Sequence, residues 1–181
     1  MGKAAVFLDR DDTLIENVPY LGDPDKVRLL PGAQEAMKML HHENLPLVVV
    51  SNQSGVGRGL ITKEQVRAVD ARMETLLGMG FFEYRHCFAA PGDPYDDQRK
   101  PSPRMLQESA EEHHFDLSRS FMVGNRLSDI QAGRAAGCKT VLLKLRAYPE
   151  DEKESIALAD YCAESWDDAA TWIVSRTRVS A

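Results

Sequence analysis

The sequence has few cysteines, no long apolar run and no excess of positive charge. Its 181 residues include three cysteines, Cys87, Cys138 and Cys162, which are widely spaced and form no CxxC pair. An odd number of scattered cysteines is typical of reduced thiols rather than of a disulfide framework or a zinc knuckle. No apolar stretch approaches the roughly 20 residues of a membrane span, and the N-terminus carries no signal-peptide pattern. We therefore expect a cytoplasmic protein without a membrane partner.

Basic residues are too few for a general nucleic-acid-binding surface. The chain has 22 Lys and Arg against 28 Asp and Glu, a formal net charge of -6. Broad nucleic-acid binding needs a basic face that displaces counterions from phosphates. We expect no nucleic-acid partner, although a local basic pocket for a small anion is compatible with this balance. The length favours a single domain, residues 1–181, and we expect a monomer.

Short apolar runs alternate with amphipathic segments along the chain. Five runs, expected to be parallel strands buried on both faces, span residues 4–8, 46–50, 84–88, 120–123 and 139–143. Helical patterns begin at Pro31, Thr62 and Ser102, and a fourth ends at Gly137. This order predicts an α/β fold, a three-layer α/β/α Rossmann-like domain with a mainly parallel sheet. Residues 14–30 and 88–99 are too few to form a separate cap domain, so we expect no large cap.

Polar residues follow four of the expected strands, at the edge where an open parallel sheet binds its ligands. These groups are Asp9, Asp11, Asp12 and Thr13; Ser51, Asn52, Gln53 and Ser54; Arg99 and Lys100; and Gly124, Asn125, Arg126 and Asp129. Carboxylates, amides, hydroxyls and cations together can hold a phosphate with a hard divalent metal. One carboxylate can attack phosphorus, and a second, two residues on, can transfer the proton.

These segments resemble the haloacid dehalogenase superfamily of phosphatases. FLDRDDTL, VVVSNQSGVGRG, RKPSPRML and MVGNRLSDIQAG follow the order of that family's motifs over nearly the whole chain. They are similar to the branch that holds the D-glycero-D-manno-heptose 1,7-bisphosphate 7-phosphatases and the histidinol-phosphatases, and SNQSGVGRG is nearer the heptose enzymes. The resemblance implies a Mg²⁺-dependent phosphomonoester hydrolase with an aspartyl-phosphate intermediate. It also implies a small phosphorylated sugar as substrate, in lipopolysaccharide heptose biosynthesis.

The resemblance assigns roles to the matching positions. The implied catalytic residues are Asp9 as nucleophile, Asp11 as acid/base, and Ser51 and Lys100 as groups that stabilise the transferring phosphoryl group. The implied metal site comprises Asp9, the backbone carbonyl of Asp11, and Asn125, with Asp129 behind it. The implied substrate-binding residues are Asn17, Val18, Pro19, Tyr20, Ser51, Asn52, Gln53, Ser54, Arg58, Arg99, Lys100 and Arg126.

Three positions depart from the family pattern. Asn125 stands where the family usually has Asp, which removes a negative charge and should weaken Mg²⁺ binding. Asp12 stands where the nearer relatives carry Gly, and we expect its side chain to point to solvent. Those relatives often hold a zinc ion with three Cys and a His, whereas the loop CFAAPGDPYDDQRK has Cys87 alone, so we expect no structural zinc.

Other interpretations remain open at this point. The substrate could be histidinol phosphate or another small phosphomonoester, or the chain could be a catalytically weakened phosphate-binding protein. Action on nucleic-acid ends would use the same fold, but the acidic balance argues against it. The apolar stripe Val66, Val69, Met73 and Leu76 is expected to be core, and Trp166 and Trp172 are expected to dock the last helix on the sheet.

Overall fold

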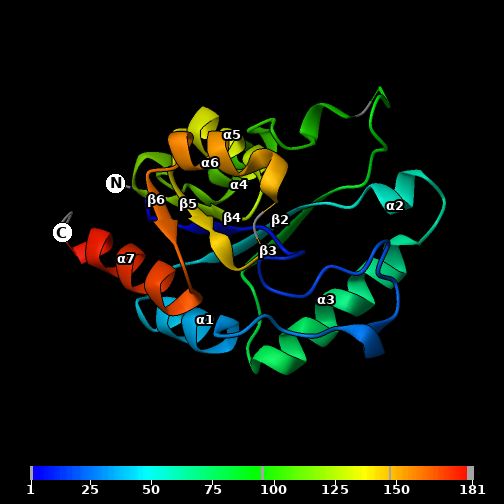
Figure 1. Cartoon of the computed structure of the whole chain (residues 1–181), viewed down its shortest axis with the longest axis horizontal. Helices are drawn as coiled ribbons and strands as arrows, with labels where there is room; N and C mark the ends of the chain where they lie inside the picture. The colour runs from blue at the N-terminus through cyan, green and yellow to red at the C-terminus, as the bar shows by residue number, and fades with distance from the viewer. Residues whose placement is uncertain (1, 95, 147, 179–181) are drawn as a thin grey trace.

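The computed structural model, which describes residues 2–94, 96–146 and 148–178, contains one parallel sheet of six strands within those ranges. The strands are β1 (Val6–Leu8), β2 (Leu47–Asn52), β3 (Glu83–Cys87), β4 (Phe121–Gly124), β5 (Lys139–Leu143) and β6 (Tyr161–Ala163). Their order across the sheet is β3-β2-β1-β4-β5-β6, and every neighbouring pair is parallel (Figure 1). The predicted α/β class is confirmed.

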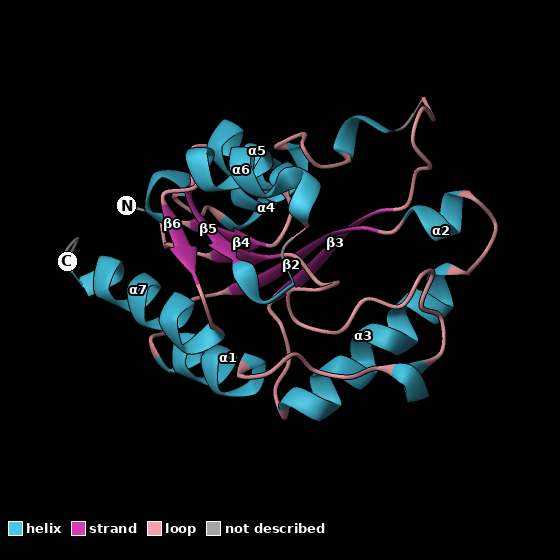
Figure 2. Cartoon of the chain, in the orientation of Figure 1, coloured by secondary structure: helices cyan, strands magenta, loops and turns pink. Residues whose placement is uncertain are grey.

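Helices cover both faces of the sheet and make the three expected layers. Figure 2 shows α1 (Ala33–His42), α3 (Lys63–Leu77) and α7 (Trp166–Arg178) on one face. It shows α4 (Arg104–His113), α5 (Leu127–Ala136) and α6 (Pro149–Leu158) on the other. A single-turn helix, α2 (Ser54–Gly57), follows β2. Short 3-10 turns lie at Pro24–Lys26, Asp96–Gln98, Leu117–Arg119 and Lys144–Arg146.

Alternation along the strands explains why both faces are covered. Val6 and Leu8 of β1 belong to the apolar cluster that includes α1, α3 and α7 residues, whereas Phe7 belongs to the cluster on the α4 and α5 side. Successive strand residues point to opposite faces, so a strand that is apolar throughout requires helices on both sides. The expected core stripe of α3 is confirmed for Val66, Val69 and Met73, which are buried. Leu76 is half-buried and packs against the apolar cluster that contains Val69 and Met73.

One strand was not predicted, two predicted helix starts are wrong, and four of the five expected strands differ at their ends by one or two residues. A sixth strand, β6, was missed because its three residues Tyr161–Ala163 carry too little pattern to stand out from a loop. The first helix begins at Ala33 rather than at Pro31, because Gly32 adopts a positive φ of 79° that precedes the helix. The helix expected from Ser102 begins at Arg104. The capping box at Thr62 and the left-handed stop at Gly137, with φ 88°, are confirmed.

The order of strands brings two chain segments together at one point of the sheet edge. Along the chain the strands are added on one side of β1, as β2 and β3, and then on its other side, as β4, β5 and β6, so the strand order reverses between β1 and β4. Leu8 of β1 is paired with Val123 of β4. The backbone N–H of Asp9 continues this pairing by donating to Val123 O at 2.9 Å. A reversal of this kind leaves a crevice beyond the carboxyl ends of the two strands, where ligands bind in open α/β sheets.

The last helix docks on the sheet as expected, and it also reaches the segment after β1. The Trp166 side chain is fully buried, and its Nε1 donates to Thr13 O at 2.7 Å. Trp172 stacks on Tyr161 of β6 with ring centroids 4.9 Å apart. Among the described residues, no helix is long and apolar enough to cross a membrane.

Candidate active site

A buried lysine joins two carboxylates at the centre of the site. The Lys100 Nζ atom lies 2.7 Å from Asp9 Oδ1 and 2.7 Å from Asp129 Oδ1. The same atom donates to Val50 O at 2.7 Å. All three charged side chains are buried, so water screens their mutual attraction only weakly. The residues predicted from three separate strand ends are therefore in direct contact.

Asn52 holds the backbone of Lys100 in place. Its Oδ1 accepts from Lys100 N at 3.0 Å, and its Nδ2 donates to Lys100 O at 3.2 Å. A side-chain amide that pairs with both backbone groups of one residue acts like a neighbouring strand. The end of β2 thus fixes where the lysine enters the site.

Burial and neighbouring charge shift the proton affinity of the central pair. Burial has the largest effect on Asp9 and raises its pKa to about 7, while Lys100 lowers this pKa and Asp129 and Asp11 raise it. Burial lowers the pKa of Lys100, but Asp129 and Asp9 outweigh it, so that pKa lies above its ordinary value and the amine stays charged. A divalent cation beside Asp9 would favour its ionised, nucleophilic form.

Asn125, at the end of β4, has its amide group fixed in one orientation. Its Nδ2 donates to Arg146 O at 2.9 Å, and its Oδ1 accepts from Thr13 Oγ1 at 3.3 Å. The Thr13 hydroxyl also lies 3.4 Å from Asp9 Oδ2. The side-chain oxygens of Asn125 and Asp9 therefore face the same hydroxyl, and the amide nitrogen faces away from it.

Two side chains hold the carboxylate of Asp11. The guanidinium of Arg10 contacts both oxygens, with Nη2 at 3.3 Å from Oδ1 and 3.2 Å from Oδ2. Gln53 Nε2 donates to Oδ2 at 2.7 Å and to Ser51 Oγ at 2.8 Å. The orientation of Asp11 is thereby fixed from two sides.

The expectation that Asp12 points to solvent is wrong. Its backbone adopts the left-handed conformation, with φ 57°, which Asp tolerates better than most residues. Its carboxylate accepts from Asn17 N at 3.0 Å and from the Tyr148 hydroxyl at 2.9 Å. The third carboxylate is thus turned towards the rim of the site and held there by two donors.

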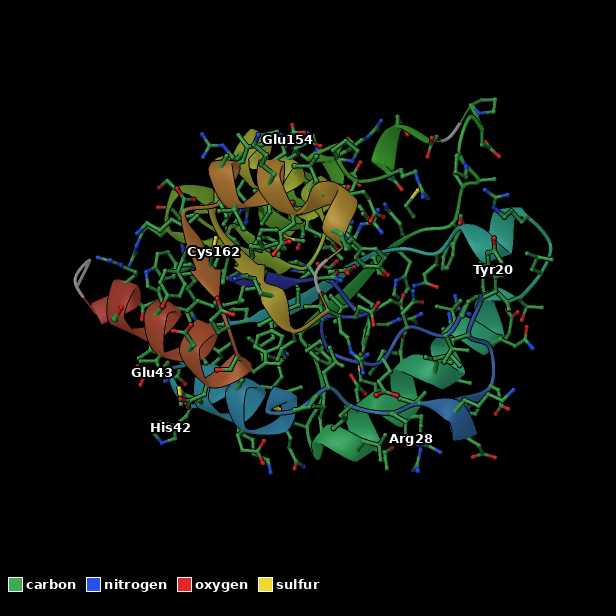
Figure 3. All side chains as sticks on the ribbon, in the orientation of Figure 1. Tyr20, Arg28, His42, Glu43, Glu154 and Cys162 are labelled. Atoms are coloured by element: carbon green, nitrogen blue, oxygen red, sulfur yellow. The ribbon has the colours of Figure 1, made fainter. Side chains whose placement is uncertain are left out.

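Two adjoining cavities contain most of the predicted substrate-binding residues. A cavity of about 450 Å³ is lined by Asp9, Asp11, Asn17, Ser51, Asn52, Arg99, Lys100, Asn125, Arg126, Ser128, Asp129 and Tyr148. A second, of about 240 Å³, shares Asp11, Asn17 and Asn52 with it and is also lined by Arg10, Val18, Pro19, Tyr20, Leu21, Gln53, Ser54, Gly55 and Ile61. Figure 3 shows Tyr20 beside α2, at the outer end of the molecule. The exposed Arg58 lines neither cavity.

Comparison with known proteins places this site in a family. A model of the HAD-hydrolase-like family matches residues 98–169. A D-glycero-beta-D-manno-heptose-1,7-bisphosphate 7-phosphatase of Pasteurella multocida is 35% identical over 176 residues, which cover 92% of this chain and 94% of that protein. The enzyme of the same name from Escherichia coli K12 is 34% identical, over 77% of this chain and 78% of its own length.

The chain belongs to the heptose-bisphosphate phosphatase family of HAD-like hydrolases. A solved structure agrees with this assignment. The D,D-heptose 1,7-bisphosphate phosphatase of B. bronchiseptica, crystallised with magnesium and phosphate, superposes with a TM-score of 0.83. The two are 27% identical, and the match covers 95% of this chain and 98% of the other. The protein is a phosphatase.

In this phosphatase Arg99 and Arg126, two of the three arginines expected to contact the substrate, already have acidic partners. Arg126 Nε donates to Asp151 Oδ2 at 2.7 Å, and its guanidinium lies 3.8 Å from the centre of the Tyr148 ring. Arg99 Nε lies 3.9 Å from Asp96 Oδ1. A substrate phosphate would have to compete with these carboxylates for either arginine.

Three residues at this phosphatase site were not predicted from the sequence. Tyr148 and Ser128 line the larger cavity, and Arg10 holds Asp11. Nothing in the sequence around Tyr148 indicated that it returns to the first motif, because its contact with Asp12 joins residues far apart in the chain. Arg10 lies inside the motif itself, and a charged residue at the end of an apolar strand was a signal that could have identified it.

Proposed function

We propose that this phosphatase removes the 7-phosphate of D-glycero-D-manno-heptose 1,7-bisphosphate. The observation that carries the proposal is the contact of Lys100 Nζ with Asp9 Oδ1, at 2.7 Å, in a polar cavity large enough for a sugar phosphate. A buried carboxylate beside a fixed cation is the arrangement that phosphoryl transfer to an aspartate needs. The names of the relatives from P. multocida and E. coli support the choice of sugar.

We propose Mg²⁺ as the cofactor. It would be held by Asp9, by the backbone carbonyl of Asp11 and by Asn125, with Asp129 behind them. The donor set supports this choice because it consists of oxygen atoms, which Mg²⁺ prefers. The orientation of Asn125 supports it further, because the amide oxygen faces the same hydroxyl as Asp9 Oδ2. When bound, Mg²⁺ supplies positive charge that reduces repulsion between the phosphate and the carboxylates.

The reaction then proceeds in two displacements. The carboxylate of Asp9 attacks phosphorus, and the bond from phosphorus to the sugar oxygen breaks while Asp11 gives that oxygen a proton. Water next attacks the aspartyl-phosphate, and Asp11 takes the proton from the water, which releases inorganic phosphate and restores Asp9. Lys100 balances the negative charge on the phosphoryl oxygens during both steps, and the Ser51 hydroxyl donates a hydrogen bond to one of them.

The test is hydrolysis of the heptose bisphosphate beside a panel of small phosphomonoesters that includes histidinol phosphate. We expect the heptose bisphosphate to have the highest kcat/KM, and turnover to disappear in Asp9→Asn. Asp167→Asn is the matched control, because this exposed residue in the first turn of α7 lies outside both cavities, and the variant should retain activity. Comparable kcat/KM values across the panel would contradict the choice of heptose.

A less specific phosphatase is the second candidate. The contact of Arg126 with Asp151 favours it, since this cation is then less available for the second phosphate of a bisphosphate. Similar kcat/KM values for the heptose bisphosphate and for small monophosphates would support this candidate over the heptose-specific enzyme.

We further propose that residues 1–181 act as one hydrolase domain, as a cytoplasmic monomer that needs no zinc and binds neither nucleic acid nor membranes. The loop that carries zinc in nearer relatives has a single cysteine here, Cys87, which supports the zinc-free state. Light scattering would test the oligomeric state. Elemental analysis of active protein would test for zinc, and a stoichiometric amount of it would contradict the proposal.

A further inference from the structure

A line of contacts leads from Asp11 away from the cavity to the edge of the sheet. Arg10 contacts Asp11 through Nη2 and donates through Nη1 to Asp70 Oδ1 at 2.9 Å. The other oxygen of that carboxylate, Asp70 Oδ2, lies 2.7 Å from His86 Nε2. Asp70 comes from α3 and His86 from the edge strand β3. Four residues, from the segment after β1, from α3 and from β3, thus form one continuous series of hydrogen bonds.

Three of the four side chains in this series are buried, so their charges depend on one another. The exposed fractions of the Arg10, Asp70 and His86 side chains are 1%, 7% and 7%. Burial lowers the pKa of Arg10, but Asp11 and Asp70 outweigh it, so that pKa lies above its ordinary value and the guanidinium stays charged. A buried cation of this kind needs its carboxylate partners, since removing one leaves charge uncompensated.

The direction of the outer hydrogen bond follows from the groups involved. A carboxylate can only accept, so the proton between Asp70 Oδ2 and His86 belongs to Nε2 of the imidazole. The other ring nitrogen, His86 Nδ1, is buried and has no hydrogen-bond partner. The histidine therefore holds one oxygen of Asp70 while Arg10 holds the other.

We propose that Asp70 and His86 are positioning residues for the acid/base Asp11 and act on it through Arg10. The proposal rests on the function proposed above, in which Asp11 transfers a proton to the leaving oxygen. Arg10 can keep both oxygens of Asp11 in place only while its own Nη1 is anchored. Asp70 provides that anchor, and His86 fixes the orientation of Asp70.

The chemistry gives this role a signature that a purely structural role lacks. A sugar alkoxide is a poor leaving group and needs the proton from Asp11, whereas p-nitrophenolate leaves without one. The value of kcat/KM reports the steps up to phosphoryl transfer onto Asp9. Misplacing Asp11 should therefore lower kcat/KM for a sugar phosphate much more than for p-nitrophenyl phosphate.

The experiment measures both substrates with Asp70→Ala and with the pair His86→Phe and His86→Gln. For Asp70→Ala we expect kcat/KM to fall about 10- to 100-fold with the sugar phosphate and less than about threefold with p-nitrophenyl phosphate. His86→Phe should show the same difference between the two substrates, with a smaller loss of kcat/KM. His86→Gln should keep kcat/KM near the wild-type value on both substrates, since its side-chain amide can donate to Asp70 from a similar position.

Ser120→Ala is the matched control for lost stability. Ser120 is buried just before β4, at the opposite end of that strand from the site. Its hydroxyl accepts a hydrogen bond from Ala5 N and donates one to Asp116 O. This variant should lower the unfolding free energy and leave the ratio of the two kcat/KM values, for the sugar phosphate and p-nitrophenyl phosphate, unchanged. Equal losses on both substrates in Asp70→Ala and His86→Phe would overturn the proposal. If Asp70→Ala does not fold, the two His86 variants at the sheet edge decide.

A structural measurement separates this proposal from the proposed function. If the wild-type protein hydrolyses no phosphomonoester, the proposed function fails, and the crystal structure of His86→Phe then tests the positioning alone. We expect Asp70 and Arg10 to shift and Asp11 to lose its two-oxygen contact with the guanidinium. An Asp11 carboxylate that keeps both contacts in that variant would overturn the proposal.

Discussion

Asn125 lies at the proposed metal site, where a carboxylate would add negative charge but would lose a hydrogen bond. Its Nδ2 donates to Arg146 O, and the side chain is buried. An aspartate there would place a carboxylate oxygen against that backbone carbonyl. In the proposed metal site, Asn125 would therefore lower the affinity for Mg²⁺ while it keeps a fixed contact with the backbone of Arg146.

The Asn125→Asp variant tests this exchange. We expect the Mg²⁺ concentration for half-maximal activity to fall about tenfold, because ligand charge sets the affinity of oxygen sites. We also expect the metal-free protein to lose about 1–3 kcal/mol of unfolding free energy, since a carbonyl loses its donor. Metal titrations and urea unfolding measure the two effects. An unchanged metal requirement would show that position 125 is not a ligand.

Asp12→Gly introduces glycine at the left-handed position after Asp11. Glycine relieves the left-handed backbone at φ 57°, but it removes the acceptors for Asn17 N and the Tyr148 hydroxyl. These effects oppose each other, so we expect the unfolding free energy to change by less than about 1 kcal/mol. The Mg²⁺ requirement should stay the same, because the carboxylate is held by Tyr148. A lower requirement would show that the charge of Asp12 matters to the metal.

At the scale of elements, α7 supports the catalytic segment directly. The buried Trp166 at its start donates to Thr13 O, in the turn that follows Asp9. Trp166→Phe should cost about 1–3 kcal/mol of unfolding free energy, because the buried carbonyl is left without its donor. Trp172→Phe keeps a ring against Tyr161 and is the control, with a smaller expected loss. Equal losses in urea unfolding would mean that the hydrogen bond contributes little.

The elements that the sequence predicted well are those whose pattern is local. The apolar strands and the helix caps at Thr62 and Gly137 are each specified by a few neighbouring residues. The strand β6 was missed because three residues at a sheet edge acquire their structure from pairing with β5. Asp70 was also missed, although it lies among the buried residues Val66, Val69 and Met73 of α3, where a charge needs a partner.

At the scale of the whole molecule, the sheet order explains why the central site was predictable and its surroundings were not. In a parallel sheet all strands end at one edge, so the residues after β1, β2 and β4 had to converge. The contacts of Tyr148 and the line from Arg10 to His86 depend instead on how helices and loops pack on that sheet. Such long-range pairings leave no periodic signal in the sequence.

Metal binding should stabilise the whole molecule because it relieves repulsion among buried carboxylates. Mg²⁺ at a concentration 100 times its Kd should add about 2.7 kcal/mol to the unfolding free energy. Thermal unfolding with Mg²⁺ and with a chelator measures this effect. The increase should be much smaller in Asp9→Asn, and it should be retained in Ser120→Ala, whose site is intact. An equal increase in Asp9→Asn would place the metal elsewhere.

The central claim is that Asp9 becomes phosphorylated during turnover. Rapid quenching of the enzyme with its substrate, followed by borohydride reduction and peptide mass spectrometry, would detect this directly. We expect homoserine in place of Asp9 and an unmodified Asp11, and no modification of either residue in the absence of substrate. Turnover that leaves Asp9 unmodified, or modification of another residue, would contradict it.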